Sequence, residues 1–195
     1  MKTTHILTVL FLLLVTTFAS AQSSTSNATT VKYPLDVSKS ELHWKGHYSF
    51  LVSEHTGTAT FTQGELITIN GNITGGSFEV DMTSITNEEY MKNGNGPVDH
   101  LKDPDFFDVQ RYPKASLTIT NVTFIEEENK HKMEADMTIK GITKPIEFWP
   151  TVDEETKTMV AHLKIDRTRW GIVYNNDVKD HAISDAIELK AILRF

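Results

Sequence analysis

Apolar and polar residues alternate with a period of two along most of the chain after Tyr33. This alternation is typical of strands that bury one face and expose the other. The clearest case is the last strand, which places on one face Ile187, Leu189, Ala191, Leu193 and Phe195. No stretch longer than a turn or two has the spacing of an amphipathic helix, and the short helical candidates lie at 87–93 and 98–103.

Turn sequences separate the alternating runs. Gly and Asn residues within 70–76 predict turns there, and further polar turns are predicted at 126–129, 140–145 and 153–156. Short strands joined by short turns predict an antiparallel sheet. About eight strands with one apolar face each need either a second sheet or closure into a barrel. The pattern therefore predicts an all-β domain without internal repeats.

Two segments interrupt the alternation. The first runs from 86 to 113 and contains Gly94-Asn95-Gly96-Pro97. A loop of this length in a compact domain is usually functional or a lid, so we expect a long loop with a short helix between strands. The second interruption runs from 166 to 180 and carries two arginines, two aromatic residues and several acidic residues.

The N-terminal residues indicate an export signal. Lys2 is followed by an apolar stretch over 6–15 and then by Ala19-Ser20-Ala21. This arrangement is typical of a secretory signal peptide, and the apolar stretch is shorter than the roughly 20 residues that span a bilayer. We predict a signal peptide at 1–21, a flexible leader at 22–32 and one domain at 33–195, with no stable membrane insertion.

Composition narrows the function classes. Apolar residues make up 39% and charged residues 23%, which is a globular composition. The net charge of -7 argues against nucleic-acid binding and against electrostatic docking on anionic lipid. The absence of cysteine excludes disulfides, thiolate zinc sites and cysteine nucleophiles.

Six blocks of the sequence carry a family resemblance. They are the "HL…DFFD…YP" block at 100–113, the "MTIKGITKP" hairpin at 137–145, the "FEVDMTSI" strand at 78–85, His55-Thr56-Gly57, Asp166-Arg167 with Trp170-Gly171-Ile172, and Ile183-Ser184-Asp185. Together they resemble the YceI-like family, and the resemblance covers residues 33–195. The blocks occur in the same order as in the family, which makes the set far more specific than any single block.

The resemblance implies an exported, lipocalin-like barrel of about eight antiparallel strands. Family members are similar to polyisoprenoid-binding proteins, which hold a polyprenyl quinone or polyprenyl phosphate inside the barrel, and they are periplasmic or secreted bacterial proteins. The expected role is transport, storage or sequestration of an amphiphilic lipid, without catalysis or a cofactor. The alternative is a ligand-free exported stress-response or interaction protein with a closed barrel core.

The inward faces of the strands supply the candidate lipid site. Small residues there leave volume, and Met side chains adapt to an irregular apolar guest. The alternative is that the same side chains fill a closed core. The apolar candidates on the strands are Phe61, Phe78, Val80, Met82, Leu117, Ile119, Met133, Ala135, Met137, Phe148, Ala161 and Leu163.

Aromatic residues in the two interruptions extend this site. Phe106 and Phe107 are lid candidates that either plug the barrel or touch the guest. Trp170 is a rim or core aromatic residue for which ligand contact is possible. The three together form the predicted apolar boundary of the cavity.

Three polar residues are candidates for contact with the lipid head group. His55 either contacts the head group or is a hydrogen-bonded structural residue. Arg167 and Arg169 have fork-shaped donors suited to a phosphate or quinone oxygen. For Arg167 the alternative is a pair with Asp166 that fixes the loop.

Other functions have weaker support. The run from Asp99 to Asp108 is acidic, but it lacks metal-ligand spacing, so no metal site is predicted. No Gly-x-Ser-x-Gly motif is present, so no hydrolase is predicted. A homodimer is left open.

Overall fold

The computed structural model describes residues 28–48, 54–87, 97–173 and 183–195. Within these ranges it contains ten β-strands, the helix α2 (Pro97–Lys102), and the 3-10 helices η1 (Glu126–Glu128) and η2 (Arg167–Trp170). None of the helices in the described ranges has the length and apolar character needed to cross a bilayer. The strands are β1 (Thr30–Pro34), β2 (Glu41–Tyr48), β3 (Glu54–Ile69), β4 (Asn72–Thr86), β5 (Lys114–Ile125), β6 (Lys130–Ile139), β7 (Ile142–Phe148), β8 (Thr151–Asp153), β9 (Thr158–Asp166) and β10 (Ile183–Arg194).

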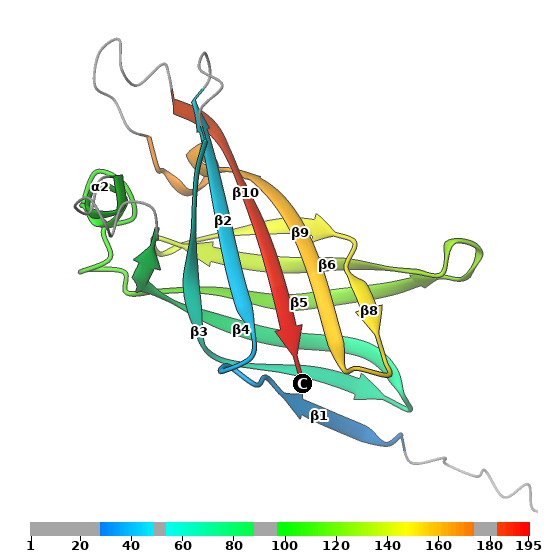
Figure 1. Cartoon of the computed structure of the whole chain (residues 1–195). Helices are drawn as coiled ribbons and strands as arrows, with labels where there is room; N and C mark the ends of the chain where they lie inside the picture. Colours follow the sequence, from blue (N-terminus) through cyan, green and yellow to red (C-terminus); the bar gives the residue numbers. More distant parts are fainter. Residues whose placement is uncertain (1–27, 49–53, 88–96, 174–182) are drawn as a thin grey trace, which may run out of the picture.

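All strands belong to one antiparallel sheet. The order is β7-β6-β5-β4-β3-β2-β10-β9-β8, and β1 pairs with β3 outside this path. The sheet curls so that β2, β10 and β9 lie across the interior from β4, β5 and β6 (Figure 1). The all-β antiparallel prediction is confirmed. The long loop with a short helix is also present, because α2 lies between β4 and β5.

The predicted strand count and closure differ from what is observed. β1 and β8 are additional short strands of five and three residues. β1 starts inside the predicted leader, and β8 is too short for alternation to reveal it. Among the described residues, the two ends of the hydrogen-bonded path, β7 and β8, are not paired with each other.

Side chains of η2 bridge the unpaired side of the sheet. η2 follows β9, and the Trp170 indole Nε1 donates a hydrogen bond to the Met137 carbonyl of β6 at 3.1 Å. The Arg169 guanidinium donates to the Pro145 carbonyl of β7 at 3.0 Å. Trp170 is completely buried. The gap beside β7 is therefore filled by an aromatic side chain rather than by a strand ladder.

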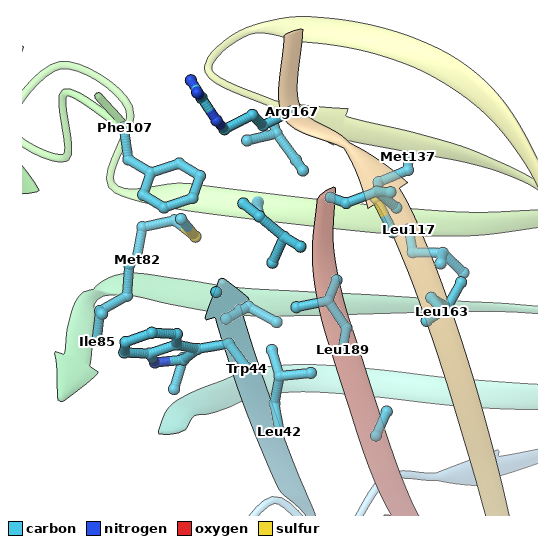
Figure 2. Close-up of a pocket in the computed structure, with 18 of the residues that line it drawn as sticks. Leu42, Trp44, Met82, Ile85, Phe107, Leu117, Met137, Leu163, Arg167 and Leu189 are labelled. Carbon is cyan, nitrogen blue, oxygen red and sulfur yellow. The ribbon is translucent and has the colours of Figure 1, made fainter. Parts of the chain in front are cut away.

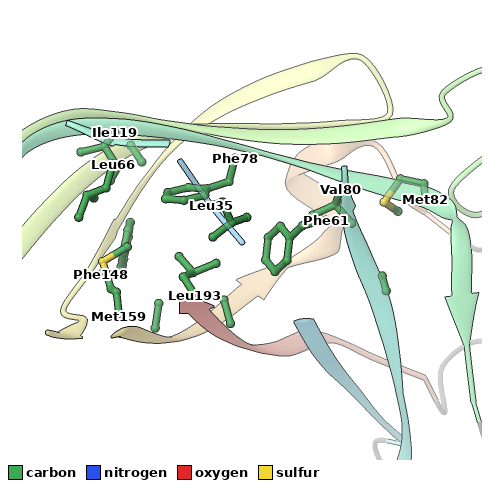
Figure 3. Close-up of a cluster of buried hydrophobic side chains, with 14 of the residues drawn as sticks. Leu35, Phe61, Leu66, Phe78, Val80, Met82, Ile119, Phe148, Met159 and Leu193 are labelled. Carbon is green, nitrogen blue, oxygen red and sulfur yellow. The ribbon is translucent and has the colours of Figure 1, made fainter. Parts of the chain in front are cut away.

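One end of the interior is densely packed. Side chains from opposite sides of the curled sheet meet there, including Leu35, Leu66, Ile119, Phe148 and Leu193 (Figure 3). All five are less than 9% exposed. Burial of these apolar side chains stabilises the sheet, at about 1.5–3 kcal/mol for each large side chain that is fully buried.

Two inward-facing glycines differ sharply in the space around them. A Cβ at Gly57 would collide with the Thr86 carbonyl oxygen and would lie 2.6 Å from Cζ2 of Trp44, whereas a Cβ at Gly46 would meet no atom of the described residues within 4 Å. We expect Gly57→Ala to lower the free energy of unfolding by about 1–3 kcal/mol through overpacking. Gly46→Ala is the matched control and should be neutral or slightly stabilising. Urea unfolding measures both, and equal effects would contradict this assignment.

Candidate functional site

A cavity of about 260 Å³ lies between the packed end of the interior and α2. This volume is close to the lower end of the range for small-molecule pockets, roughly 300–1,000 Å³. Side chains from β2, β4, β5, β9 and β10 point into it, and Phe107 reaches it from the loop after α2 (Figure 2). The described lining is almost entirely apolar. The interior is therefore not a fully packed core.

Most of the predicted site residues line this cavity. The two-residue alternation identified the inward face correctly on β3, β4, β5, β6 and β9. The predicted residues that line the cavity are Phe61, Phe78, Val80, Met82, Phe106, Phe107, Leu117, Met137, Phe148, Ala161 and Leu163, with His55 and Arg167 among the polar candidates.

Five predicted site residues lie elsewhere. Ile119, Met133 and Ala135 face inward but belong to the densely packed end, where they are 6%, 0% and 1% exposed. Alternation along a strand gives the face of a side chain and not its depth along the interior. Trp170 fills the gap beside β7, and Arg169 contacts Pro145 on the outside of that gap. None of the five lines the cavity.

Several lining residues were not in the predicted site. β2 contributes Leu42, Trp44 and Gly46, β4 contributes Ile85, and β9 contributes Met159. The alternation of Leu42, Trp44 and Gly46 was the available signal, because it places all three on one face of β2. The indole nitrogen of Trp44 is buried and has no hydrogen-bond partner in the part of the chain that the structure describes.

Arg167 lies at the end of the cavity near α2 and is buried, with 3% of its surface exposed. Its Nε donates to the Ser184 carbonyl at 3.3 Å and its Nη1 to the Ile172 carbonyl at 2.6 Å. Its Nη2 lies 3.0 Å from Oδ1 of Asp185, so its ion-pair partner is Asp185 and not the predicted Asp166. The guanidinium carbon also lies 5.6 Å from the centre of the Phe106 ring.

Two partners of Arg167 lie in an irregular part of β10. The register between β10 and β2 shifts between Ile183 and Ile187. This bulge contains Ser184 and Asp185, whose carbonyl and carboxylate face Arg167. Bulges of this kind redirect side chains next to binding sites.

Asp166 caps η2 instead of pairing with Arg167. Its Oδ1 accepts hydrogen bonds from the Thr168 amide at 2.9 Å and from the Thr168 hydroxyl at 2.6 Å. The bonds from Thr168 hold the pKa of the Asp166 carboxyl below its ordinary value of 3.8. A lowered pKa in the folded state means that this stabilisation is present above the ordinary value and is lost as the pH falls through the lowered one.

We therefore expect Asp166→Ala to lower the free energy of unfolding at neutral pH by about 1 kcal/mol, as for loss of a helix cap. The difference between the variant and the wild type should shrink as the pH falls through the acidic range. Urea unfolding at pH 7 and at successively lower pH measures it. A difference that stays constant down to the lowest pH would contradict the capping role.

The loop after α2 is attached to the β6–β7 turn. The Lys140 ammonium donates to the carbonyls of Pro104 at 2.9 Å and Phe106 at 2.7 Å. The Phe106 ring packs edge-on against Phe107, with centroids 5.0 Å apart. Lys140 therefore holds in place the aromatic residues at this end of the cavity.

Replacing Lys140 with Met should loosen that attachment. We expect faster hydrogen exchange in residues 101–109 while exchange in β3 and β4 stays unchanged, because the two bonds join only this loop to the turn. Lys144→Met, on the same hairpin, is the control. Unchanged exchange in 101–109 would argue against the attachment.

Near the same loop, side-chain ligand atoms of His100, Asp103 and Asp105 lie within 4.8 Å of one another. Both carboxylates are exposed. Exposed acidic groups gather in this way without an ion, and we assign no metal site to them.

A family model for the YceI-like domain matches residues 33–195. The chain belongs to the YceI-like family. Among curated relatives, a UPF0312 protein of Pseudomonas putida is 28% identical over 102 residues, which is 50% of this chain and 53% of the relative. A UPF0312 protein of Photorhabdus laumondii is 38% identical over 47 residues, 24% of this chain and 23% of the relative. The chain thus matches about half or less of the length of these relatives.

The solved structure of BcnA supports the fold of this YceI-like chain. BcnA of Burkholderia cenocepacia superposes with a TM-score of 0.67 over 82% of this chain and 98% of that one, at 19% identity. A YceI protein of Campylobacter jejuni gives a TM-score of 0.48 at 20% identity, over 64% of this chain and 74% of that one. At these identities the likeness concerns the fold alone. The family predicted from the sequence blocks is confirmed.

Proposed function

We propose that this YceI-like protein binds the hydrocarbon chain of an amphiphilic lipid, a polyisoprenoid in particular, in the cavity of its curled sheet. The observation that carries the proposal is an interior cavity with an almost entirely apolar lining. The role is transport, storage or sequestration of the lipid. The curled sheet acts as a barrel in which η2 replaces the missing ladder beside β7.

The expected affinity comes from apolar burial. Each CH₂ group moved from water into the cavity contributes about 0.8 kcal/mol, so a few isoprene units suffice for micromolar binding. Met82, Met137 and Met159 line the cavity, and their flexible thioethers fit a branched chain. The closed end limits how deep a chain can enter, because Phe78, Phe148 and related side chains are packed there.

Catalysis is not part of the proposal. The described lining contains no Asp or Glu, so it offers no carboxylate for general acid–base chemistry. The polar lining residues His47, His55, His100, Ser116, Ser184 and Arg167 are candidates for contact with the lipid head group.

Export is proposed from the sequence. The predicted signal peptide at 1–21 lies outside the described residues. The proposed location is the periplasm or the exterior, where a chain without cysteine has no disulfides and depends on its hydrophobic core for stability.

Native mass spectrometry of the protein purified without detergent tests the proposal. We expect an adduct of several hundred daltons that solvent extraction releases as a polyprenyl species, because an apolar cavity retains its guest in water. The same spectra distinguish monomer from homodimer. A bare mass that does not change after incubation with polyprenyl lipids would favour the ligand-free interaction protein instead.

A further inference from the structure

The charge at the inner surface of the cavity is concentrated in one side chain. Of the described residues that line the cavity, Arg167 is the one Lys, Arg, Asp or Glu. Its side chain is 4% exposed. A buried charge is stable only when it is paired and hydrogen-bonded. The partners of Arg167 therefore determine how much positive charge and which N–H donors are left for a lipid head group at this end of the cavity.

Those partners already neutralise the guanidinium. Asp185, just outside the lining, lies 3.0 Å from Nη2, and two carbonyl oxygens, of Ser184 and Ile172, accept from Nε and Nη1. Two of the five N–H groups of the guanidinium therefore donate to backbone carbonyls, and Nη2 lies at ion-pair distance from Asp185. Within the described residues, the guanidinium thus keeps N–H groups that can donate to an uncharged oxygen without disturbing the pair.

An anionic head group must compete with Asp185 for the Arg167 guanidinium. To pair with Arg167, a phosphate or carboxylate must either displace Asp185 or lie beside its negative charge. Like charges at this separation repel, and the described lining supplies no second cation to offset the lost hydration of the anion. The net charge of -7 adds to this disadvantage.

We propose that Asp185 makes the cavity selective for lipids with an uncharged polar head group, such as a hydroxyl, ketone or amide, over those with a phosphate or carboxylate. The proposal rests on lipid binding in this cavity as proposed above. It assigns to Asp185 a positioning role: the carboxylate holds and neutralises the Arg167 guanidinium.

The test compares two ligands that share one chain, geranylgeraniol and geranylgeranyl phosphate, at pH 7.5. At this pH the phosphate carries about two negative charges. Dissociation constants are measured by fluorescence titration for the wild type, Asp185→Asn and Asp136→Asn. Asp136 is exposed on β6 and does not line the cavity. Its variant therefore matches the change in net charge without touching Arg167.

We expect the wild type and Asp136→Asn to bind the alcohol about tenfold or more tightly than the phosphate. In Asp185→Asn the ratio of the two dissociation constants should shift by about tenfold in favour of the phosphate, because the Arg167 guanidinium then lacks its carboxylate partner. Asp185 is 62% exposed and Arg167 keeps its two carbonyl acceptors, so Asp185→Asn should still fold, with a lower unfolding temperature than the wild type that thermal unfolding measures.

Three outcomes would overturn the proposal. The wild type binds the phosphate as tightly as the alcohol, or Asp185→Asn and Asp136→Asn show the same ratio. In both cases the cavity still binds prenyl chains, and only the selectivity role fails. Binding of neither ligand to the wild type would overturn the lipid-binding function as well.

Discussion

Replacing Gly46 with Phe is expected to abolish lipid binding while leaving the protein folded. Gly46 lines the cavity from β2, and in the part of the chain that the structure describes a Cβ at this position meets no atom within 4 Å. A benzyl group there enters open space and occupies volume that the lipid needs. We expect the dissociation constant for geranylgeraniol to rise by on the order of 100-fold or more. The ring displaces several CH₂ groups of the lipid from the cavity, and the binding free energy lost with them corresponds to a change of this order.

The control for this experiment is Lys45→Phe, the adjacent position on the same strand. Successive side chains of a strand point to opposite faces, so this aromatic ring lies on the outer surface. Lys45→Phe should leave the dissociation constant for geranylgeraniol unchanged within a factor of about two, because the ring does not enter the cavity. The substitution removes one exposed ion pair, with Glu54, which contributes little to stability. Normal lipid binding by Gly46→Phe would contradict the placement of the lipid in this cavity.

The thermal unfolding of Gly46→Phe separates blocked binding from misfolding. Replacing a glycine in a strand with an aromatic residue favours the extended backbone. We therefore expect an unfolding temperature within a few degrees of the wild type in the absence of lipid. A steep loss of stability would mean that the space beside Gly46 does not accept a ring.

Ala135 and Ala161 illustrate how far the sequence could predict the site. Both alternate with polar neighbours in strands, and both face the interior as expected. Ala161 lines the cavity, whereas Ala135 pairs with Ile119 and Ile146 in the packed end. The depth of a residue depends on strand registers and bulges, such as the shift between Ile119 and Asn121, which the two-residue period does not encode.

Arg167 illustrates the same limit for polar residues. Asp166 is its neighbour in sequence and was the predicted partner, but its carboxylate turns to the Thr168 amide and hydroxyl of η2. Asp185 is the partner because β10 pairs with β9 at Ala186 and Asp166, which places the residues next to this pair, Asp185 and Arg167, close together. Local sequence spacing cannot reveal a pair that depends on the packing of two strands.

The sheet needs a substitute for the pairing that its ends lack. Among the described residues, β7 and β8 share no ladder, although β7 lies near β9 and η2. An unpaired edge exposes backbone N–H and C=O groups to water unless side chains cover it. η2 supplies part of this cover, because Arg169 donates to the Pro145 carbonyl of β7 at 3.0 Å and the completely buried Trp170 donates to Met137 of β6 at 3.1 Å.

Trp170→Ala is therefore expected to be among the most destabilising single substitutions in the protein. Removing a fully buried Trp leaves a cavity and should lower the free energy of unfolding by about 3–5 kcal/mol. Trp170→Phe keeps most of the ring and removes the hydrogen bond, so its loss should be smaller, about 1–3 kcal/mol. Urea unfolding measures both values, and hydrogen exchange should report faster exchange in β7 for the Ala variant.

Trp149 provides the comparison that makes this prediction specific. It follows β7 and is 50% exposed, with the Lys132 ammonium 5.9 Å from its ring centre. Trp149→Ala should lower the free energy of unfolding by about half as much as Trp170→Ala or less, because about half of the Trp149 surface is already exposed to water. If both alanine variants lost the same stability, η2 would be a surface feature. A large difference would mean that one aromatic side chain performs the closure that strand pairing performs elsewhere in the sheet.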